Sequence, residues 1–328
     1  MAAFDDIIGH EAIKSRLITA FNKNRIPSAY LFIGYSGIGK SSLARLYAQY
    51  INCETKDFCG HCSNCRLFEN GSHPDFISIK PDGQFIKISQ IQSLISQLGI
   101  TPAYASKRVA LVKEAHRLNQ ESANSFLKIL EEPPLDTLII LTSSDENLLL
   151  ETILSRCQKI SFTPLSRENL NEILDINSLT PENKEFVLNY SGGAIRKDLV
   201  EKVDVLLPMR ERVFALLNNL QDESMVSHFN QLDNWIQKDL HPYFFEFAVH
   251  LFRDLIFINA GQEELITNKD RLEAIKNQPW PYSEEQLQWA VNLILETETA
   301  VKLYAGKVLA LESLLIQIKQ VFSGRLVI

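Results

Sequence analysis

The first half of the chain alternates between short apolar runs and segments with helical periodicity. The runs predict buried strands, and they lie at 29–33, 75–80, 108–112, 137–142 and 158–162. Segments with apolar residues at helical spacing stand between them at 41–52, 88–99 and 119–131, and another follows an entry loop within 4–26. Strands that alternate with helices are typical of a parallel sheet with helices on its faces. The pattern therefore predicts an α/β fold with a parallel sheet for residues 1–163.

Beyond residue 163 the pattern is helical throughout. Pro164 and Ser166 mark a boundary, because a serine just before an amphipathic run is a typical helix N-cap. We predict a small helical lid domain at 164–205 and an all-α domain at 206–328. The long apolar-periodic segments of this last domain lie at 213–220, 242–259, 284–297 and 305–322. Its aromatic residues between Tyr243 and Phe257 predict a helix-bundle core rather than a cofactor site.

The apolar run at 29–33 leads into the motif G-x-x-x-x-G-K-S, which extends from Gly34 to Ser41. A strand, a glycine-rich turn and a helix follow one another, as a phosphate-binding P-loop requires. Its backbone N–H groups and helix N-terminus would hold phosphate oxygens. Lys40 would reach the β- and γ-phosphates and Ser41 would hold Mg²⁺, so the motif indicates ATP with Mg²⁺ as its ligand. The predicted nucleotide-binding residues are Gly34, Gly37, Gly39, Lys40, Ser41 and Ser42.

The run at 108–112 is the best candidate for the second strand of such a site, whose end normally carries an acidic residue for the Mg²⁺ shell. Lys113 and Glu114 stand where an Asp-Glu pair is expected. The ammonium of Lys113 would repel Mg²⁺, and Glu114 would be the water-activating base of a degenerate site. One interpretation is that nucleotide binds and is hydrolysed poorly or not at all. The other places the acidic residue elsewhere, although Asp136 and Asp145 fit the spacing less well. We favour the first.

Composition narrows the classes of protein to which the chain can belong. It has 328 residues and a formal net charge of −7 at pH 7, which argues against an autonomous nucleic-acid binder with a basic surface. No run reaches about 18 uninterrupted apolar residues, so the sequence predicts no membrane span. The N-terminus lacks the basic segment of a signal peptide. We expect a cytoplasmic protein, in which cysteines stay reduced.

Four of the five cysteines fall within thirteen residues, in the pattern C-x5-C-x2-C-x2-C formed by Cys53, Cys59, Cys62 and Cys65. Thiolates at this spacing favour tetrahedral Zn²⁺. No open coordination position is implied, so we predict a structural zinc knuckle whose folding depends on the metal. His61 and His73 are alternative ligands for one cysteine position. An iron–sulfur cluster is the other interpretation, since similar cysteine densities hold those clusters.

Four local sequences together resemble one protein family. They are Ala29-Tyr30-Leu31-Phe32 before the P-loop, the C-x2-C-x2-C knuckle after it, the segment NSFLKILEEPP at 124–134, and Ile153-Leu154-Ser155-Arg156-Cys157. In this combination the chain resembles the bacterial clamp-loader ATPases of the AAA+ class. The resemblance covers about residues 4–200, and beyond 205 it is a general one to a helical collar domain. It implies a P-loop AAA+ domain with a zinc knuckle, a helical lid, and a collar that joins subunits.

The resemblance also implies roles for residues outside the P-loop. In the family, the Ser-Arg-Cys triplet presents an arginine to ATP held by a neighbouring subunit, which implies that Arg156 is an arginine finger acting in trans. A guanidinium can neutralise the charge that develops on a γ-phosphate. Ser143 and Ser144 occupy the region of the family's first sensor, and Arg196 occupies that of the second.

The function implied by the resemblance is that of a clamp-loader subunit of the replicative DNA polymerase III holoenzyme, a nucleotidyltransferase complex. Its partners would be the gamma/tau and delta subunits in a hetero-pentamer, the sliding clamp, and primed DNA bound by the whole complex. Lys113 departs from the hydrolysing members, so we expect a stator-like subunit without independent enzymatic activity. Two alternatives stay open: an active gamma/tau-like ATPase, and a zinc-dependent DNA-binding protein, against which the acidic balance argues.

Overall fold

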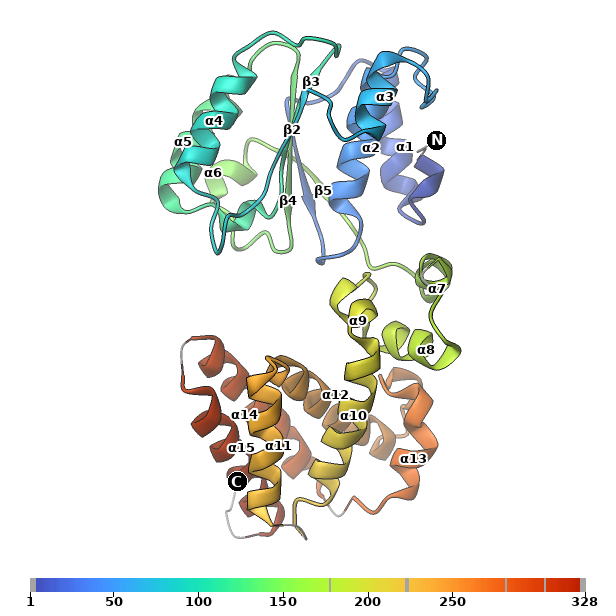
Figure 1. Ribbon diagram of the computed structural model, residues 1–328, viewed down its shortest axis with the longest axis vertical. Helices are drawn as coiled ribbons and strands as arrows, with labels where there is room; N and C mark the ends of the chain where they lie inside the picture. The colour runs from blue at the N-terminus through green and yellow to red at the C-terminus, as the bar shows by residue number, and fades with distance from the viewer. Residues whose placement is uncertain (1–3, 177, 222–223, 281, 304, 325–328) are drawn as a thin grey trace. The chain divides into compact units, whose positions relative to one another are not determined.

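A five-stranded parallel sheet forms the centre of the N-terminal part of the protein (Figure 1). The computed structural model describes residues 4–176, 178–221, 224–280, 282–303 and 305–324. Within them the strands are β1 (Ala29–Ile33), β2 (Phe76–Ile79), β3 (Arg108–Val112), β4 (Thr137–Ser143) and β5 (Gln158–Ser161). They lie in the order β2-β3-β4-β1-β5, and each neighbouring pair is parallel. This topology confirms the predicted α/β class.

Helices cover both faces of the sheet (Figure 1). One face carries α1 (Glu11–Asn22), α2 (Lys40–Asn52) and α3 (Ser63–Glu69), and the other carries α4 (Ile88–Leu98), α5 (Gln120–Glu131) and α6 (Glu151–Leu154). Successive side chains of a strand point to opposite faces. Tyr30 and Phe32 of β1 therefore enter the core on the α2 side, whereas Leu31 enters the core on the α5 side. Burial of both faces explains why the central strands are apolar throughout rather than alternating.

The register of the sheet brings three loops to one edge. β1 pairs with β4 so that Ile33 lies opposite Ser143, and β3 pairs with β4 so that Val112 lies opposite Leu141. Parallel strands end at the same edge, so the loops that follow β1, β3 and β4 lie side by side. Open parallel sheets bind their ligands at this carboxyl edge, which is where the P-loop and Lys113 both fall.

The chain forms two compact units. The first consists of Met1–Ser178 and Gly192–Arg196, and the second of Leu179–Ser191 and Lys197–Ile328. The first unit also contains α7 (Arg167–Asp175) and the short 3-10 helices η1 (Phe4–Asp6) and η2 (Ala115–Arg117). The segment 192–196 thus belongs with the sheet, although helices of the second unit flank it in the sequence. The division into AAA+, lid and collar domains stays a prediction.

The second unit is built from helices. They are α8 (Pro181–Tyr190), α9 (Lys197–Glu201), α10 (Val203–Asn218), α11 (Met225–Gln237), α12 (His241–Asn259), α13 (Leu272–Asn277), α14 (Glu284–Lys302) and α15 (Lys307–Phe322), with the 3-10 helices η3 (Glu263–Leu265) and η4 (Lys269–Arg271). Phe244, Phe247 and Phe252 of α12 are fully buried, as expected for a bundle core. No helix among the described residues is long and apolar enough to cross a membrane.

One helix of this unit contains an internal proline. The apolar-periodic segment at 213–220 overlaps α10, which begins at Val203 and runs through Pro208. A proline removes one backbone donor and crowds the preceding turn, so it usually ends a helix. Here Val203 and Leu206 on the first turn are buried, and their packing keeps the turn helical despite the missing hydrogen bond.

Candidate functional site

The glycine motif forms a tight loop between β1 and α2. Gly37 has a φ of 80° and Gly39, the residue before the first turn of α2, has a φ of 98°. Both angles fall in the left-handed region, which costs a glycine little because it has no Cβ. The first N–H groups of a helix have no partner within the helix. The loop therefore directs backbone donors toward the carboxyl edge of the sheet, as phosphate binding needs.

The segment 192–196 packs directly against this loop. The Ile195 N–H donates to the Gly37 carbonyl oxygen at 3.2 Å. A Cβ added to Gly37 would lie 2.0 Å from the Ile195 carbonyl oxygen, so no larger residue fits there without a shift of backbone. Arg196, the predicted second-sensor residue, is next in the chain and half-buried. The tertiary structure thus brings the segment that carries Arg196 to the P-loop from far along the sequence.

Lys40 is the first residue of α2, and its ammonium turns back over the loop. Its Nζ donates to the carbonyl oxygens of Gly34 at 2.5 Å and Tyr35 at 2.7 Å. Burial lowers the pKa of Lys40 to about 8, and attraction to the Glu114 carboxylate acts in the opposite direction. Both acceptors are backbone atoms of the phosphate loop, so the ammonium is held beside the place that phosphates would occupy.

Lys113 and Glu114 follow β3 at the same edge. The Lys113 N–H donates to the Ile79 carbonyl oxygen of β2 at 2.9 Å, which fixes its backbone at the end of the sheet. Glu114 has a φ of 53°, and one carboxylate oxygen lies 2.9 Å from Nε of Arg117. The carboxylate at this position is therefore engaged by a guanidinium. The residue that stands where a Mg²⁺ ligand is expected is a lysine.

The two alternative aspartates have other surroundings than a metal-binding acid at the end of β3 would have. Asp136 immediately precedes β4, so it lies at the amino edge of the sheet, away from the P-loop, and it pairs with Lys107 at 3.8 Å. Asp145 follows β4 at the correct edge, but its Oδ1 accepts hydrogen bonds from the backbone N–H (2.9 Å) and the side-chain amide (3.0 Å) of Asn147. The donor set of this edge therefore does not fit Mg²⁺ well.

Ser143 and Ser144, predicted for the first sensor, lie at the end of β4 but in different surroundings. Ser143 is buried, and its hydroxyl donates to the Asp145 carbonyl oxygen at 2.6 Å. Nδ1 of His116 lies 3.1 Å from the same hydroxyl oxygen and acts as the donor there. Burial lowers the pKa of His116, which favours its neutral form. Ser144 is exposed. His116 has no recognisable sequence motif, and its contact with Ser143 was not predicted.

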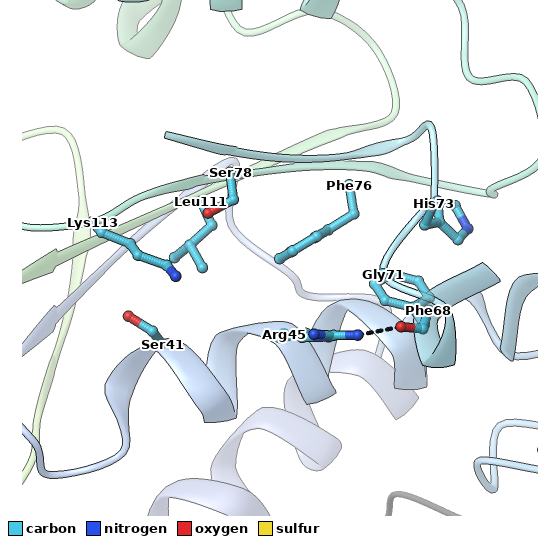
Figure 2. Close-up of a pocket in the computed structure, with 9 residues that line it drawn as sticks. All are labelled: Ser41, Arg45, Phe68, Gly71, His73, Phe76, Ser78, Leu111 and Lys113. Atoms are coloured by element: carbon cyan, nitrogen blue, oxygen red, sulfur yellow. Dashed lines mark hydrogen bonds between the residues drawn. The ribbon is translucent and has the colours of Figure 1, made fainter. Parts of the chain in front are cut away.

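A cavity of about 370 Å³ opens between α2 and the β2–β3 edge of the sheet (Figure 2). Its lining includes Ser41, Arg45, Phe68, Phe76, Leu111 and Lys113. Figure 2 shows the Lys113 side chain reaching from the end of β3 toward the start of α2, where Ser41 lies. At the other end, the Arg45 guanidinium donates to the Phe68 carbonyl oxygen. The lining contains cations and aromatic rings but no carboxylate.

Arg156 lies just beyond α6, one-third exposed, and is held by the first unit itself. Its Nη2 is 2.7 Å from Oε1 of Glu131 at the end of α5, and its Nη1 donates to the Thr152 carbonyl oxygen at 2.9 Å. A partly exposed, oriented guanidinium is suited to contact an anionic group outside this chain. Glu131 belongs to the NSFLKILEEPP segment, whose link to Arg156 only the fold reveals.

The four clustered cysteines come together after α2. Their Sγ atoms all lie within 4.8 Å of one another, and the group could hold a metal ion. Zn–S bonds of about 2.3 Å put tetrahedral sulfurs just under 4 Å apart, so the cluster has a suitable size. The Cys62 N–H donates to Sγ of Cys59, and the Cys65 N–H donates to Sγ of Cys62, each at 3.4 Å. Such bonds stabilise negative charge on the sulfurs.

The two histidines near the cluster are occupied elsewhere. His61 is exposed, with Nδ1 2.8 Å from the Cys59 carbonyl oxygen. His73 is buried, with Nε2 2.9 Å from Oδ1 of Asn64, and its Nδ1 accepts from the Asp75 N–H at 3.1 Å. Both nitrogens of His73 are therefore engaged. Among the described residues the metal-ligand set consists of the four cysteines.

The thiols of the cluster differ in how readily they ionise. Burial opposes ionisation of Cys53, but hydrogen bonds from Thr55 and from nearby backbone N–H groups outweigh it and lower the pKa to about 5. Burial raises the pKa of Cys65 to about 12. All four sulfurs therefore cannot carry charge together near pH 7 unless a cation compensates them. Metal binding at such a site releases protons.

A buried ion pair at the starts of β2 and β3 was not predicted from the sequence. Asp75, fully buried before β2, lies 2.7 Å from Nη2 of Arg108 at the start of β3. Its carboxylate also accepts from the backbone N–H groups of residues 103, 104 and 105 at 2.8–3.0 Å. Burial opposes ionisation of Asp75, but these donors, with Arg108, lower its pKa to about 2. The pair fixes the loop 101–107 against the sheet.

Comparison with known proteins relates this fold to replication proteins. The model of the family "DNA polymerase III, delta subunit" matches residues 9–166. The chain is 28% identical over 288 residues to the DNA polymerase III subunit delta' of Bacillus subtilis, which covers 86% of this chain and 88% of that protein. It is 36% identical over 219 residues to the subunit tau/gamma of Haemophilus influenzae, covering 64% of this chain and 31% of that protein.

The similarity extends over most of the delta' relative but over only about a third of the tau/gamma relative. Among solved structures, a DNA polymerase III gamma subunit-related protein of Thermotoga maritima aligns with a TM-score of 0.47 and 18% identity, covering 93% of this chain and 98% of that chain. The family match falls on the unit that contains the P-loop, the cysteine cluster and Arg156, whereas the alignment with the delta' relative is longer than that unit.

Proposed function

We propose that this chain, whose homologues indicate a subunit of the DNA polymerase III clamp-loader family, acts as the stator of its complex rather than as a motor. The alignment with the delta' relative over most of both chains supports this choice. It would help to load the sliding clamp on primed DNA as one member of a hetero-pentamer with gamma/tau and delta subunits. Its collar would bury helix faces against those of neighbouring subunits.

One observation carries the stator assignment. Lys113 stands at the end of β3 in the position of the expected metal-binding acid, and the neighbouring Glu114 carboxylate is paired with Arg117 at 2.9 Å. The carboxylate that would orient the attacking water is therefore already engaged by a guanidinium. Hydrolysis at this site therefore lacks both the metal ligand and a free base, although the loop for phosphate binding is intact.

Nucleotide would be held by the P-loop without efficient turnover. Gly34, Gly37 and Gly39 shape the loop, the Lys40 ammonium lies over its carbonyl oxygens, and the hydroxyls of Ser41 and Ser42 stand at the first turn of α2. Ser143, Ser144 and Arg196 would contact the nucleotide from the two sensor positions. Bound nucleotide would order the contact between the loop and segment 192–196. The chain would then signal occupancy by its conformation rather than by hydrolysis.

Arg156 would act at the site of a neighbouring subunit. Its guanidinium is held by Glu131 and by the Thr152 carbonyl oxygen, which supports a fixed position for contact with a γ-phosphate in trans. A fixed guanidinium loses little freedom when it binds an anion. The positive charge would stabilise the negative charge that develops as the γ-phosphoryl group leaves.

The cysteine cluster would hold a structural Zn²⁺. Cys53, Cys59, Cys62 and Cys65 present four sulfurs within 4.8 Å of one another, and a site closed by four thiolates leaves no position for substrate. When bound, the metal would fix the loop between α2 and α3. A DNA-binding role for the knuckle has no support in the charge of the chain.

The test is ATP binding and single-turnover hydrolysis by the purified chain alone with Mg²⁺. We expect binding with no hydrolysis, or hydrolysis far slower than the roughly 1–100 s⁻¹ typical of kinases. Lys40→Ala is the control that shows whether any signal arises from this P-loop. Turnover at motor-like rates that disappears in Lys40→Ala would overturn the stator proposal and favour a gamma/tau-like ATPase.

A further inference from the structure

The Lys113 side chain lies in a cavity whose lining favours a bound anion. The side chain is half-buried, and among the described residues its ammonium makes no hydrogen bond or ion pair. A partly buried charge without a partner is costly, so the position favours a negatively charged ligand. The cavity that Lys113 lines also contains Ser41 and Arg45 from α2, and no acidic side chain lines it.

The same position excludes the divalent cation that usually accompanies a bound nucleoside triphosphate. Mg²⁺ normally bridges the β- and γ-phosphate oxygens and is held by the P-loop serine and by an acid from the neighbouring strand. Here Ser41 faces Lys113 across the cavity (Figure 2). An ammonium at the place of the acid repels a dication and attracts the same phosphate oxygens that the metal would bridge.

We propose that the Lys113 ammonium takes the place of Mg²⁺, so that this site binds nucleoside triphosphate without a divalent cation. The inference rests on the proposed nucleotide site and changes what that site recognises. Lys40, held over Gly34 and Tyr35, would meet the phosphates from the P-loop side, and Lys113 would meet them from the end of β3. Two ammonium groups and the N-terminus of α2 then share the charge of the triphosphate.

The cation-free site explains two features together. A P-loop is retained beside a strand end that cannot hold metal, and the lining of the cavity is cationic without compensating carboxylates. The site would take the free triphosphate at least as well as its metal complex, in contrast to a motor subunit. Nucleotide so bound would also lack the metal that draws charge from the γ-phosphate, which keeps hydrolysis slow.

The experiment measures ATP binding to the full chain by titration calorimetry, once in EDTA and once in excess Mg²⁺. We expect binding in EDTA that is at least as tight as in Mg²⁺. Lys113→Met, which keeps the length of the side chain but removes its charge, should weaken binding in EDTA about tenfold or more. Lys113→Asp should weaken it further in EDTA and make binding depend on Mg²⁺.

Lys107→Asp is the matched control, because it makes the same change of charge just before β3, at the opposite end of that strand. It should leave both affinities nearly unchanged, and thermal unfolding of each variant shows whether it folds. Binding by the unchanged chain that requires Mg²⁺, or Lys113 variants with unaltered affinity in EDTA, would overturn the inference alone. Absence of ATP binding in both buffers would overturn the inference and the proposed nucleotide site together.

Discussion

The carbonyl oxygen of Ile195 lies so close to Gly37 that a Cβ on the glycine would approach it to 2.0 Å. The two residues are also joined by a hydrogen bond from the Ile195 N–H to the Gly37 carbonyl oxygen at 3.2 Å. The phosphate loop is therefore packed against a segment that lies far from it in the sequence, between α8 and α9. A shift of the phosphate-loop backbone at Gly37 should therefore displace the segment that carries Arg196.

Gly37→Ala should destabilise the first unit by about 1–3 kcal/mol, because the added carbon meets backbone and the residue must keep a positive φ. Urea denaturation measures the free energy of unfolding. Gly83→Ala is the matched control, since Gly83 also has a positive φ (73°) but an added Cβ meets nothing within 4 Å. An equal decrease in the free energy of unfolding of the two variants would contradict a specific clash with Ile195.

Asp75 predicts a dependence of stability on pH. Its pKa is about 2 in the folded chain, below the value of about 4 for an unfolded aspartate. The carboxylate therefore contributes about 2 kcal/mol to stability above pH 4, and this contribution is lost as the pH falls from about 4 to 2. The measurement compares the free energies of unfolding of the unchanged chain and Asp75→Asn across this range.

The Asp75→Asn variant should be less stable at pH 7, and its deficit should shrink toward pH 2. Asp82→Asn serves as the control, because Asp82 is exposed and its partner Lys87 is also exposed. It should change the stability little at any pH. A deficit of Asp75→Asn that stays constant down to pH 2 would contradict the ionic role of Asp75.

The cysteine cluster predicts one bound Zn²⁺ per chain. Cys65→Ser should lower the zinc content measured by atomic absorption and lower the melting temperature by roughly 4 °C or more. Cys157→Ser is the control, because Cys157 lies after α6, outside the cluster, and burial raises its pKa to about 12. Zinc content that is unchanged in Cys65→Ser, or iron in place of zinc, would refute the proposed site.

Arg156 predicts a loss of activity that appears only in the assembled complex. Arg156→Ala should lower ATP turnover of the reconstituted clamp loader by about tenfold or more, since an arginine finger typically contributes more than this. Assembly, followed by gel filtration, should be intact. Lys159→Ala removes a nearby exposed cation paired with Glu146 and should leave turnover unchanged.

Glu131 refines this last test. Its carboxylate holds the Arg156 guanidinium at 2.7 Å, so Glu131→Ala should reduce turnover less than Arg156→Ala and should have little further effect when the two are combined. If the reductions in turnover of the two single variants add in the double variant, Glu131 acts independently of Arg156. Unchanged turnover in Arg156→Ala would remove the finger assignment altogether.

The secondary structure around the site was predictable from the sequence, because it depends on residues that are close together in the chain. The strand predicted at 108–112 and the helix predicted at 41–52 coincide with β3 and α2 to within one residue. The apolar-periodic segment at 213–220 overlaps the second half of α10, and packing of Val203 and Leu206 extends that helix back through Pro208. The set of clustered cysteines was also predictable, because their short spacing in the sequence keeps the sulfurs close together in the fold.

The sequence by itself determined the parallel α/β class, the phosphate loop and the cysteine cluster, because each is written in a short stretch with its own periodicity or spacing. Only the tertiary structure decided which distant residues meet. It set Ile195 against Gly37, Lys113 across a cavity from Ser41, and Asp75 beside Arg108. Such contacts follow from strand order and register, which depend on the packing of the whole sheet, and no local pattern encodes them.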